Sequence, residues 1–165
     1  MSLLASVGSL VAPWARLYGD SKVISTGVTF AHIGGLLLGG GCAVAGDRMS
    51  LRFRSLDPAC QHTHLDELAG LHRPVLAGLS VTLVSGLLLL AADLDTYLGS
   101  LIFWAKMTVV AVLLLNGIQL QRAERALHRE PTRPEQRWVP IRRAAIISLS
   151  LWFSATLLGT ALLVI

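Results

Sequence analysis

The segment VISTGVTFAHIGGLLLGGGCAVAG, residues 23–46, is apolar along its whole length and decides the fold class. It contains no Asp, Glu, Lys or Arg, and His32 is its one histidine. A helix of about 20 apolar residues, rising 1.5 Å per residue, is long enough to cross a hydrocarbon layer of about 30 Å. The segment is therefore predicted to be a transmembrane helix.

Small residues recur in this segment at a strict spacing of four: Gly27, Ala31, Gly35, Gly39 and Ala43. This spacing places them on one stripe of a helix, where a second helix or a flat ligand can approach closely. His32 lies one position from the stripe and about nine residues, or roughly 14 Å, from one end of the segment. An ionisable side chain at such a depth is a functional-site hypothesis by default.

The composition extends this prediction to the whole chain. Of 165 residues, 53% are hydrophobic and only 15% are charged, which excludes an ordinary soluble domain. Three further windows, residues 74–92, 99–120 and 144–165, are also long and apolar enough to span a bilayer. Short connections make neighbouring spans antiparallel. We expect an all-α fold, an integral membrane antiparallel four-helix bundle formed by residues 21–165, in contact with the lipid bilayer.

Residues 1–20 form a separate amphipathic segment. Apolar residues recur there at helical spacing, and Trp14 and Tyr18 suit the level of lipid headgroups. No basic region precedes the apolar part, so the segment does not resemble a signal peptide. We expect an interfacial helix that anchors the chain on the membrane surface. A docking site for a partner is the alternative.

The basic residues indicate orientation. The net charge is +4, and arginines gather between the first and second spans and between the third and fourth. The positive-inside rule places these connections in the cytoplasm and both termini outside, in a bacterial inner membrane. Because the basic residues flank the spans, orientation explains the charge better than nucleic-acid binding does.

The first connection contains several side chains that can bind metals. Asp57-Pro58 is a typical helix start, and a short helix is expected from about residue 59 to 71. Cys60, His62, His64, Asp66 and Glu67 lie on different faces of that helix, so a solvated polar helix is favoured over a metal site. Cys42 and Cys60 differ in depth, and no disulfide is expected.

Several polar or small positions in the spans or at their ends have a local interpretation. His72, beside Arg73, is expected to snorkel at the membrane interface, with a position inside the bundle as the alternative. The amide of Asn116 is expected to bond a neighbouring helix. A small and weakly polar stripe in the second span is expected to pack against the first; it comprises Gly78, Thr82, Ser85 and Gly86.

A candidate site combines residues predicted to lie at one depth: His32 in the first span, Lys106 and Met107 in the third, and Trp152 in the fourth. Neutral imidazole is a common haem ligand, and methionine can supply the opposite axial bond. His32 is the candidate metal ligand, and Lys106 could pair with a propionate. A histidine that merely bonds between helices remains the alternative, as does a Lys106 that snorkels outward.

The glycines beside His32 belong to the same candidate site. Gly35 and Gly39 would leave room for a flat macrocycle, and Trp152 would complete the cofactor-binding residues. The sequence therefore predicts haem b as the cofactor. Copper is the alternative, although Met107 is the only soft ligand expected near His32.

Several short motifs resemble those of the HemJ and CopD-like group of bacterial membrane proteins. They are FAHIGG at residues 30–35, SGLL at 85–88, FWAKM at 103–107 and WF at 152–153. In HemJ-like proteins, a histidine of the first helix and a lysine of the third mark a haem-associated redox site for protoporphyrinogen oxidation. The resemblance implies that His32 and Lys106 have these roles here, with Lys106 as a catalytic residue. CopD-like proteins are linked to copper handling. The chain differs from HemJ-like proteins at Trp104, where a histidine is usual, and at residues 142–144, where an Asn-Glu pair is usual.

These observations lead to three functional expectations. The first is a haem b or porphyrin binding redox protein, an oxidoreductase or electron carrier that acts with a porphyrin or quinone. The second is a non-catalytic subunit or assembly factor that joins a homo-oligomer or a larger membrane complex through its small-residue stripe. The third is transport of copper or another ion.

Overall fold

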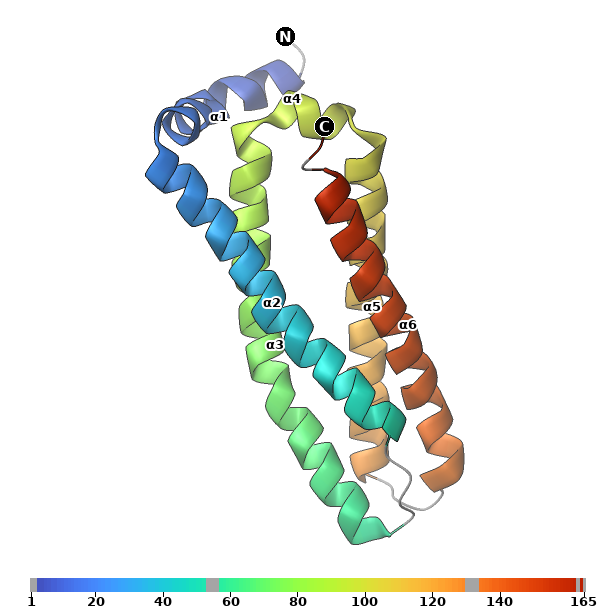
Figure 1. The fold of residues 1–165 in the computed structure, drawn as a ribbon. Helices are drawn as coiled ribbons and strands as arrows, with labels where there is room; N and C mark the ends of the chain where they lie inside the picture. The colour runs from blue at the N-terminus through green and yellow to red at the C-terminus, as the bar shows by residue number, and fades with distance from the viewer. Residues whose placement is uncertain (1–2, 53–56, 130–133, 163, 165) are drawn as a thin grey trace.

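The computed structural model describes residues 3–52, 57–129, 134–162 and 164, and this part of the chain is almost entirely helical. Six helices follow one another: α1 (Leu3–Asp20), α2 (Lys22–Arg52), α3 (Pro58–Ala92), α4 (Leu94–Gly99), α5 (Leu101–Arg129) and α6 (Pro134–Ala161). The four long helices α2, α3, α5 and α6 run beside one another, while α1 and α4 lie at one end (Figure 1).

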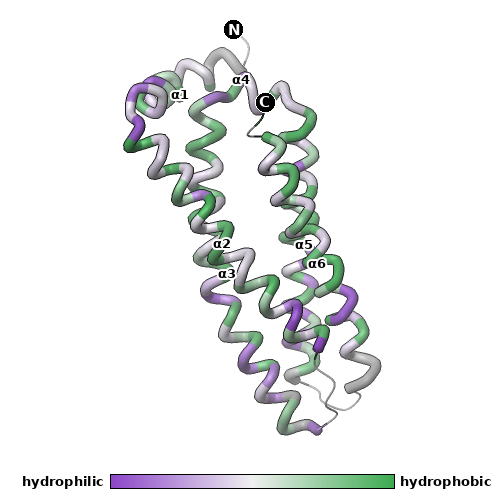
Figure 2. The backbone as a smooth tube through the Cα atoms, viewed as in Figure 1, coloured by the Kyte–Doolittle hydropathy of each residue, from purple (hydrophilic) through white to green (hydrophobic). Residues whose placement is uncertain are grey.

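The four long helices contain segments that are long and apolar enough to cross a membrane: Lys22–Arg52, His62–Ala92, Leu101–Leu127 and Trp138–Ala161. Many large apolar side chains on them face outward; Phe30 is 76% exposed and Phe153 is 71% exposed. Outward apolar surface suits contact with lipid, and these helices indicate a multi-pass membrane protein. Figure 2 shows this apolar character along the long helices and more hydrophilic residues near the end where α2 finishes.

The start of α3 agrees with its sequence signal, but the helix is longer than expected. The Asp57 side chain accepts a hydrogen bond from the backbone N–H of Ala59 at 3.1 Å, and Pro58 occupies the first turn. The separate short helix predicted for residues 59–71 is wrong, because α3 continues through Pro74 to Ala92. A proline inside a helix removes one backbone hydrogen bond without ending the helix when neighbouring packing supports both sides.

The N-terminal residues form a helix, as expected, and α1 is attached to the long helices. The indole nitrogen of Trp14 donates a hydrogen bond to the Leu88 carbonyl of α3 at 2.8 Å. The hydroxyls of Tyr18 and Thr29 lie 3.5 Å apart. Specific contacts therefore place α1 across the ends of α2 and α3 (Figure 1).

The long helices pack mainly as two pairs. Helix α2 packs along α3, α5 packs along α6, and α2 also contacts α6. The pairs lie close together where α2 ends and α6 begins, and they diverge toward α1 and α4 (Figure 1). We call these two regions the arginine-rich end and the α1–α4 end.

Glycines bring α2 and α3 into backbone contact. A methyl group added at Gly35 would lie 2.8 Å from the Gly78 carbonyl oxygen and 2.6 Å from the Thr82 hydroxyl oxygen. One added at Gly78 would meet the backbone of Gly39. The expected packing of the two small-residue stripes is thus confirmed at these positions.

The buried apolar core lies at the arginine-rich end. Its five buried side chains come from α3, α5 and α6, and they are Leu65, Leu68, Leu127, Trp138 and Ile141. Met49 of α2 packs against them with Leu120 and Ala123. All four long helices therefore contribute to one enclosed cluster, whereas the α1–α4 end has fewer contacts between the helix pairs.

We expect Gly78→Ala to destabilise the protein by about 1–3 kcal/mol, because the new methyl must push α2 away from α3. Gly70→Ala, in the same helix, is the matched control, since a methyl there meets no atom within 4 Å. The control should be neutral or slightly stabilising, because alanine is the better helix former. Thermal unfolding in detergent, followed by circular dichroism, measures both. Equal melting temperatures for the two variants would contradict this account of the interface.

Candidate functional site

His32 projects from α2 toward α3. Its Nδ1 atom lies 3.0 Å from the Thr82 carbonyl oxygen and 3.1 Å from the Ser85 hydroxyl oxygen. Its ring also lies against Gly86, where an added methyl would be 3.1 Å from the imidazole Cε1. The His32 imidazole therefore packs against the weakly polar stripe of α3.

These contacts determine the tautomer of the neutral imidazole. A backbone carbonyl only accepts hydrogen bonds, so Nδ1 must donate to Thr82. The Ser85 hydroxyl donates its hydrogen to the Val81 carbonyl of α3 at 2.6 Å, so its oxygen can accept from Nδ1. Nδ1 of His32 therefore carries the ring hydrogen, and Nε2 keeps a lone pair. No hydrogen bond to Nε2 is present in the described part of the chain.

Such an arrangement is typical of histidines that bind metals. A ligating histidine almost always donates its second ring N–H to a carbonyl or carboxylate, which orients the ring and directs the other nitrogen at the metal. The same bond also serves a histidine that only links two helices. The geometry of His32 is therefore compatible with ligation without requiring it.

Lys106 of α5 is close enough to His32 to affect its charge electrostatically. A methyl group added at Gly159 of α6 would lie 3.4 Å from the Lys106 Nζ atom. Within the described residues, no acidic side chain forms an ion pair with Lys106, so the expected outward pairing with Asp93 or Asp95 does not occur there. The two ionisable residues of the candidate site thus lie in the same region, on different helix pairs.

The other predicted cofactor residues have separate positions. Trp152 is only 7% exposed, and its ring meets α2 at Gly40, about 12 Å along the helix from His32. Met107 is 42% exposed. The α3 backbone occupies the space beside Gly35 and Gly39, which accounts for their small size without a ligand. Their cofactor roles stay predictions.

The metal-binding side chains of the first connection do not gather. Among the residues that the structure describes, no group of three His, Cys, Asp or Glu side chains could hold a metal ion. The Cys60 thiol donates to Asp57 at 3.6 Å, and His64 is buried with its ring 5.8 Å from the Trp138 ring, measured between centroids. His64 thus belongs to the buried core at the arginine-rich end.

Asn116 has the predicted role. Its side-chain amide donates to the Ala144 carbonyl of α6 at 2.9 Å, and the residue is 7% exposed. This bond links α5 to α6 inside the apolar region, where an unpaired amide would be costly.

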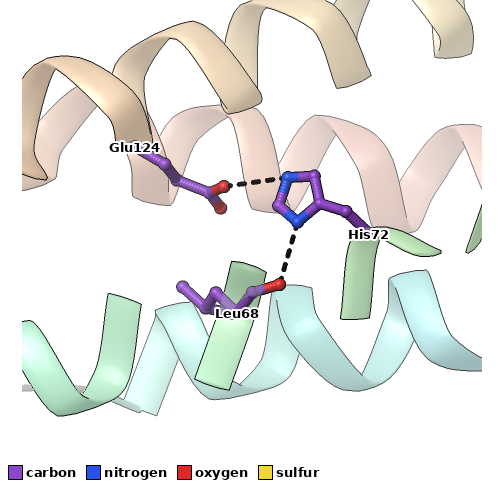
Figure 3. A network of polar contacts seen from close by, with 3 residues as sticks. All are labelled: Leu68, His72 and Glu124. Carbon is purple, nitrogen blue, oxygen red and sulfur yellow. Dashed lines mark hydrogen bonds and ion pairs between the residues drawn. The ribbon is translucent and has the colours of Figure 1, made fainter. Parts of the chain in front are cut away.

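His72 departs from the favoured expectation. Its Nδ1 atom lies 2.9 Å from the Leu68 carbonyl, and its Nε2 atom lies 3.3 Å from a Glu124 carboxyl oxygen (Figure 3). The side chain therefore turns into the bundle, while Arg73 is exposed. The snorkelling interpretation of His72 is wrong, because a buried partner on α5 offers a charge-assisted bond that the interface does not.

Asp47 and Glu124 were not singled out in the sequence. Asp47 is 2% exposed and Glu124 is 8% exposed, although both are acidic. The Ser148 hydroxyl of α6 donates to Asp47. A signal was available for Glu124, since it lies two helical turns beyond Asn116 on the same face of α5.

The chain matches no protein-family model, no curated protein and no solved structure. The resemblance to the HemJ and CopD-like group thus stays a proposal that rests on short motifs. His32 and Lys106 are the residues of those motifs that the structure brings into electrostatic contact.

We expect ¹⁵N NMR of histidine-labelled protein to show neutral His32 with its hydrogen on Nδ1. The variant His32→Gln assigns the signal. Ser85→Ala should leave the tautomer unchanged, because the Thr82 carbonyl remains as acceptor. A His32 ring with its hydrogen on Nε2 would contradict the geometry described above.

Proposed function

We propose that the chain is a multi-pass protein of a bacterial inner membrane with both termini on the outer side. The four long helices then form the antiparallel bundle, and α1 lies on the outer surface. Exposed arginines near the ends of α2 and α5 support this orientation: Arg48, Arg52, Arg122 and Arg125. The opposite connection carries exposed Asp93 and Asp95.

Labelling of cysteines tests the orientation. Cys60 is exposed beyond the apolar part of α3, whereas Cys42 lies inside α2. A membrane-impermeant maleimide should label Cys60 in inside-out vesicles and leave it unlabelled in right-side-out vesicles. Cys60→Ser should abolish the labelling. Labelling of Cys60 in right-side-out vesicles alone would reverse the orientation.

We also propose that the protein binds haem b, or a related porphyrin, through His32 and acts in redox chemistry or electron transfer. The observation that carries this proposal is the Nδ1 bond to the Thr82 carbonyl, which leaves the Nε2 lone pair for a metal. The residues present fit a haem iron in this respect, since imidazole is its commonest protein ligand. A bound haem would supply a one-electron couple.

Lys106 supports the same proposal by its charge. Its ammonium group lies in the region of His32 and has no acidic partner in the described part of the chain. A cation in apolar surroundings is costly unless an anion accompanies it. A porphyrin propionate is such an anion, so Lys106 would orient the porphyrin, and in the HemJ-like interpretation it would also contact the substrate.

The two other expected functions have less structural support. The α2 stripe, which was the expected contact surface of a subunit or assembly factor, packs against α3 at Gly35 and Gly39. Copper would need further soft ligands, and no three-residue metal group gathers in the described segments. A fixed protein partner or copper-dependent uptake would nevertheless be a direct observation in favour of either.

An absorption spectrum tests haem binding. Protein purified from cells supplied with a haem precursor should show a Soret band that is lost in His32→Ala. His62→Ala is the matched control, because His62 is an exposed histidine on the arginine-rich side of α3. A colourless wild-type protein, or an unchanged band in His32→Ala, would refute the proposal.

Lys106→Met should weaken haem binding about tenfold, as expected for loss of one charge-assisted bond. Titration of the apoprotein with haem measures the dissociation constant. Lys22→Met, which removes an exposed lysine at the start of α2, should leave the constant unchanged. Equal constants for wild type and Lys106→Met would remove Lys106 from the site.

A further inference from the structure

Three titratable side chains from three helices meet at the arginine-rich end: Asp47 of α2, His72 of α3 and Glu124 of α5. His72 Nε2 lies 3.3 Å from a Glu124 carboxyl oxygen, and Glu124 is close enough to Asp47 for the two acids to repel each other. Asp47 lies 15 residues, or about 22 Å, along α2 from His32. The group is thus separate from the proposed haem site.

The His72–Glu124 contact requires a proton. Because Nδ1 of His72 faces the Leu68 carbonyl at 2.9 Å, it must carry a ring hydrogen. Nε2 of a neutral ring would then direct a lone pair at the Glu124 oxygen 3.3 Å away, and a carboxylate oxygen has no hydrogen to offer. One further proton, on the imidazole or on the carboxyl, turns this repulsion into a hydrogen bond (Figure 3).

Asp47 adds a second acid that the histidine cannot neutralise. The Ser148 hydroxyl bonds to Asp47, but the Oδ2 atom of Asp47 is buried and has no hydrogen-bond partner in the described part of the chain. One imidazolium balances one carboxylate. A second buried carboxylate, repelled by the first, would therefore stay uncompensated unless it held a proton.

The other charges around this group do not supply the missing compensation. Arg48 next to Asp47, Arg73 next to His72, and Arg125 next to Glu124 are all exposed on their helices. Helix α6 contributes Ser148 and, further along, the partly buried Arg142, which interacts with another group. In the described part of the chain, no arginine forms an ion pair with Asp47 or Glu124. An arginine also keeps its charge throughout, so it cannot exchange a proton.

Buried apolar side chains surround the group and give it a low local dielectric constant. Leu68, Leu127 and Ile141 are almost fully buried at the same end. The His72 side chain is 28% exposed, whereas that of Glu124 is 10% exposed. The imidazole is therefore the most exposed of the three side chains.

We propose that Asp47, His72 and Glu124 form a proton-binding site that exchanges protons at the arginine-rich end. With its protons bound, the site holds one proton between His72 Nε2 and the Glu124 carboxyl, as an imidazolium–carboxylate pair, and a second proton on the Asp47 carboxyl. Proton transfer breaks the Nε2–H bond of His72 and forms an O–H bond on Glu124, which leaves a neutral pair.

Infrared spectroscopy of the purified, reconstituted protein without haem tests the assignment. Wild type at mildly acidic pH should show a protonated-carboxyl C=O band that shifts in D₂O, and Asp47→Asn should lose it. His72→Gln removes the cation beside Glu124, so that the band should about double as Glu124 also becomes protonated. Glu67→Gln, an exposed acid on α3, should leave the band unchanged. Helical circular dichroism confirms that each variant is folded.

The imidazole provides a second readout. Histidine ¹⁵N NMR should show His72 as imidazolium at neutral pH in wild type and as the neutral Nδ1–H form in Glu124→Gln. Absence of the carboxyl band, its survival in Asp47→Asn, or a neutral His72 in wild type would overturn the proposal. Loss of the band on adding Na⁺ would also overturn it, in favour of a cation site. These readouts need no haem, so their failure is distinct from failure of the haem proposal.

Discussion

The close approach of α2 and α3 is the constraint on which the remaining structure depends. Inside a bilayer, apolar helices gain little by leaving lipid for one another, so van der Waals packing and hydrogen bonds must hold them together. Gly39 and Gly78 lack the side chains that would keep the two backbones apart. The same proximity lets His32 reach the carbonyl of Thr82. Close packing and the orientation of the candidate ligand thus have one origin.

The two ends of the molecule differ in how closely the helix pairs pack and in how their polar groups are paired. At the arginine-rich end, the helix pairs converge, and apolar side chains enclose His72 and Glu124, whose ion pair replaces lost hydration. At the α1–α4 end, the pairs diverge, and polar groups such as Lys106 are left without acidic partners in the described residues (Figure 1). Hydrogen bonding from Trp14 attaches α1 to this end. The proposed proton site and the proposed haem site therefore lie in different environments.

Buried polar groups are the most informative residues of this chain. Asn116 replaces lost hydration with a hydrogen bond to α6, and one ring nitrogen of His32 does so with a hydrogen bond to α3. Asp47 and Glu124 have less compensation available from fixed charges, because the nearby arginines are exposed. His72 can compensate Glu124, whereas Asp47 is most cheaply kept in an apolar interior by protonation. Both proposals start from polar atoms whose hydrogen bonding is incomplete among the described residues.

The sequence by itself determined the four apolar helices, the cap at Asp57 and the interhelical role of Asn116, because length, hydropathy and local chemistry require no knowledge of neighbours. It also indicated which faces of the first two spans carry small residues. Only the tertiary structure decided that His72 turns toward Glu124 and that Asp47 is buried near Glu124. Helical periodicity defines the face of a residue, but the partner of that face depends on how each helix is rotated and where the pairs converge.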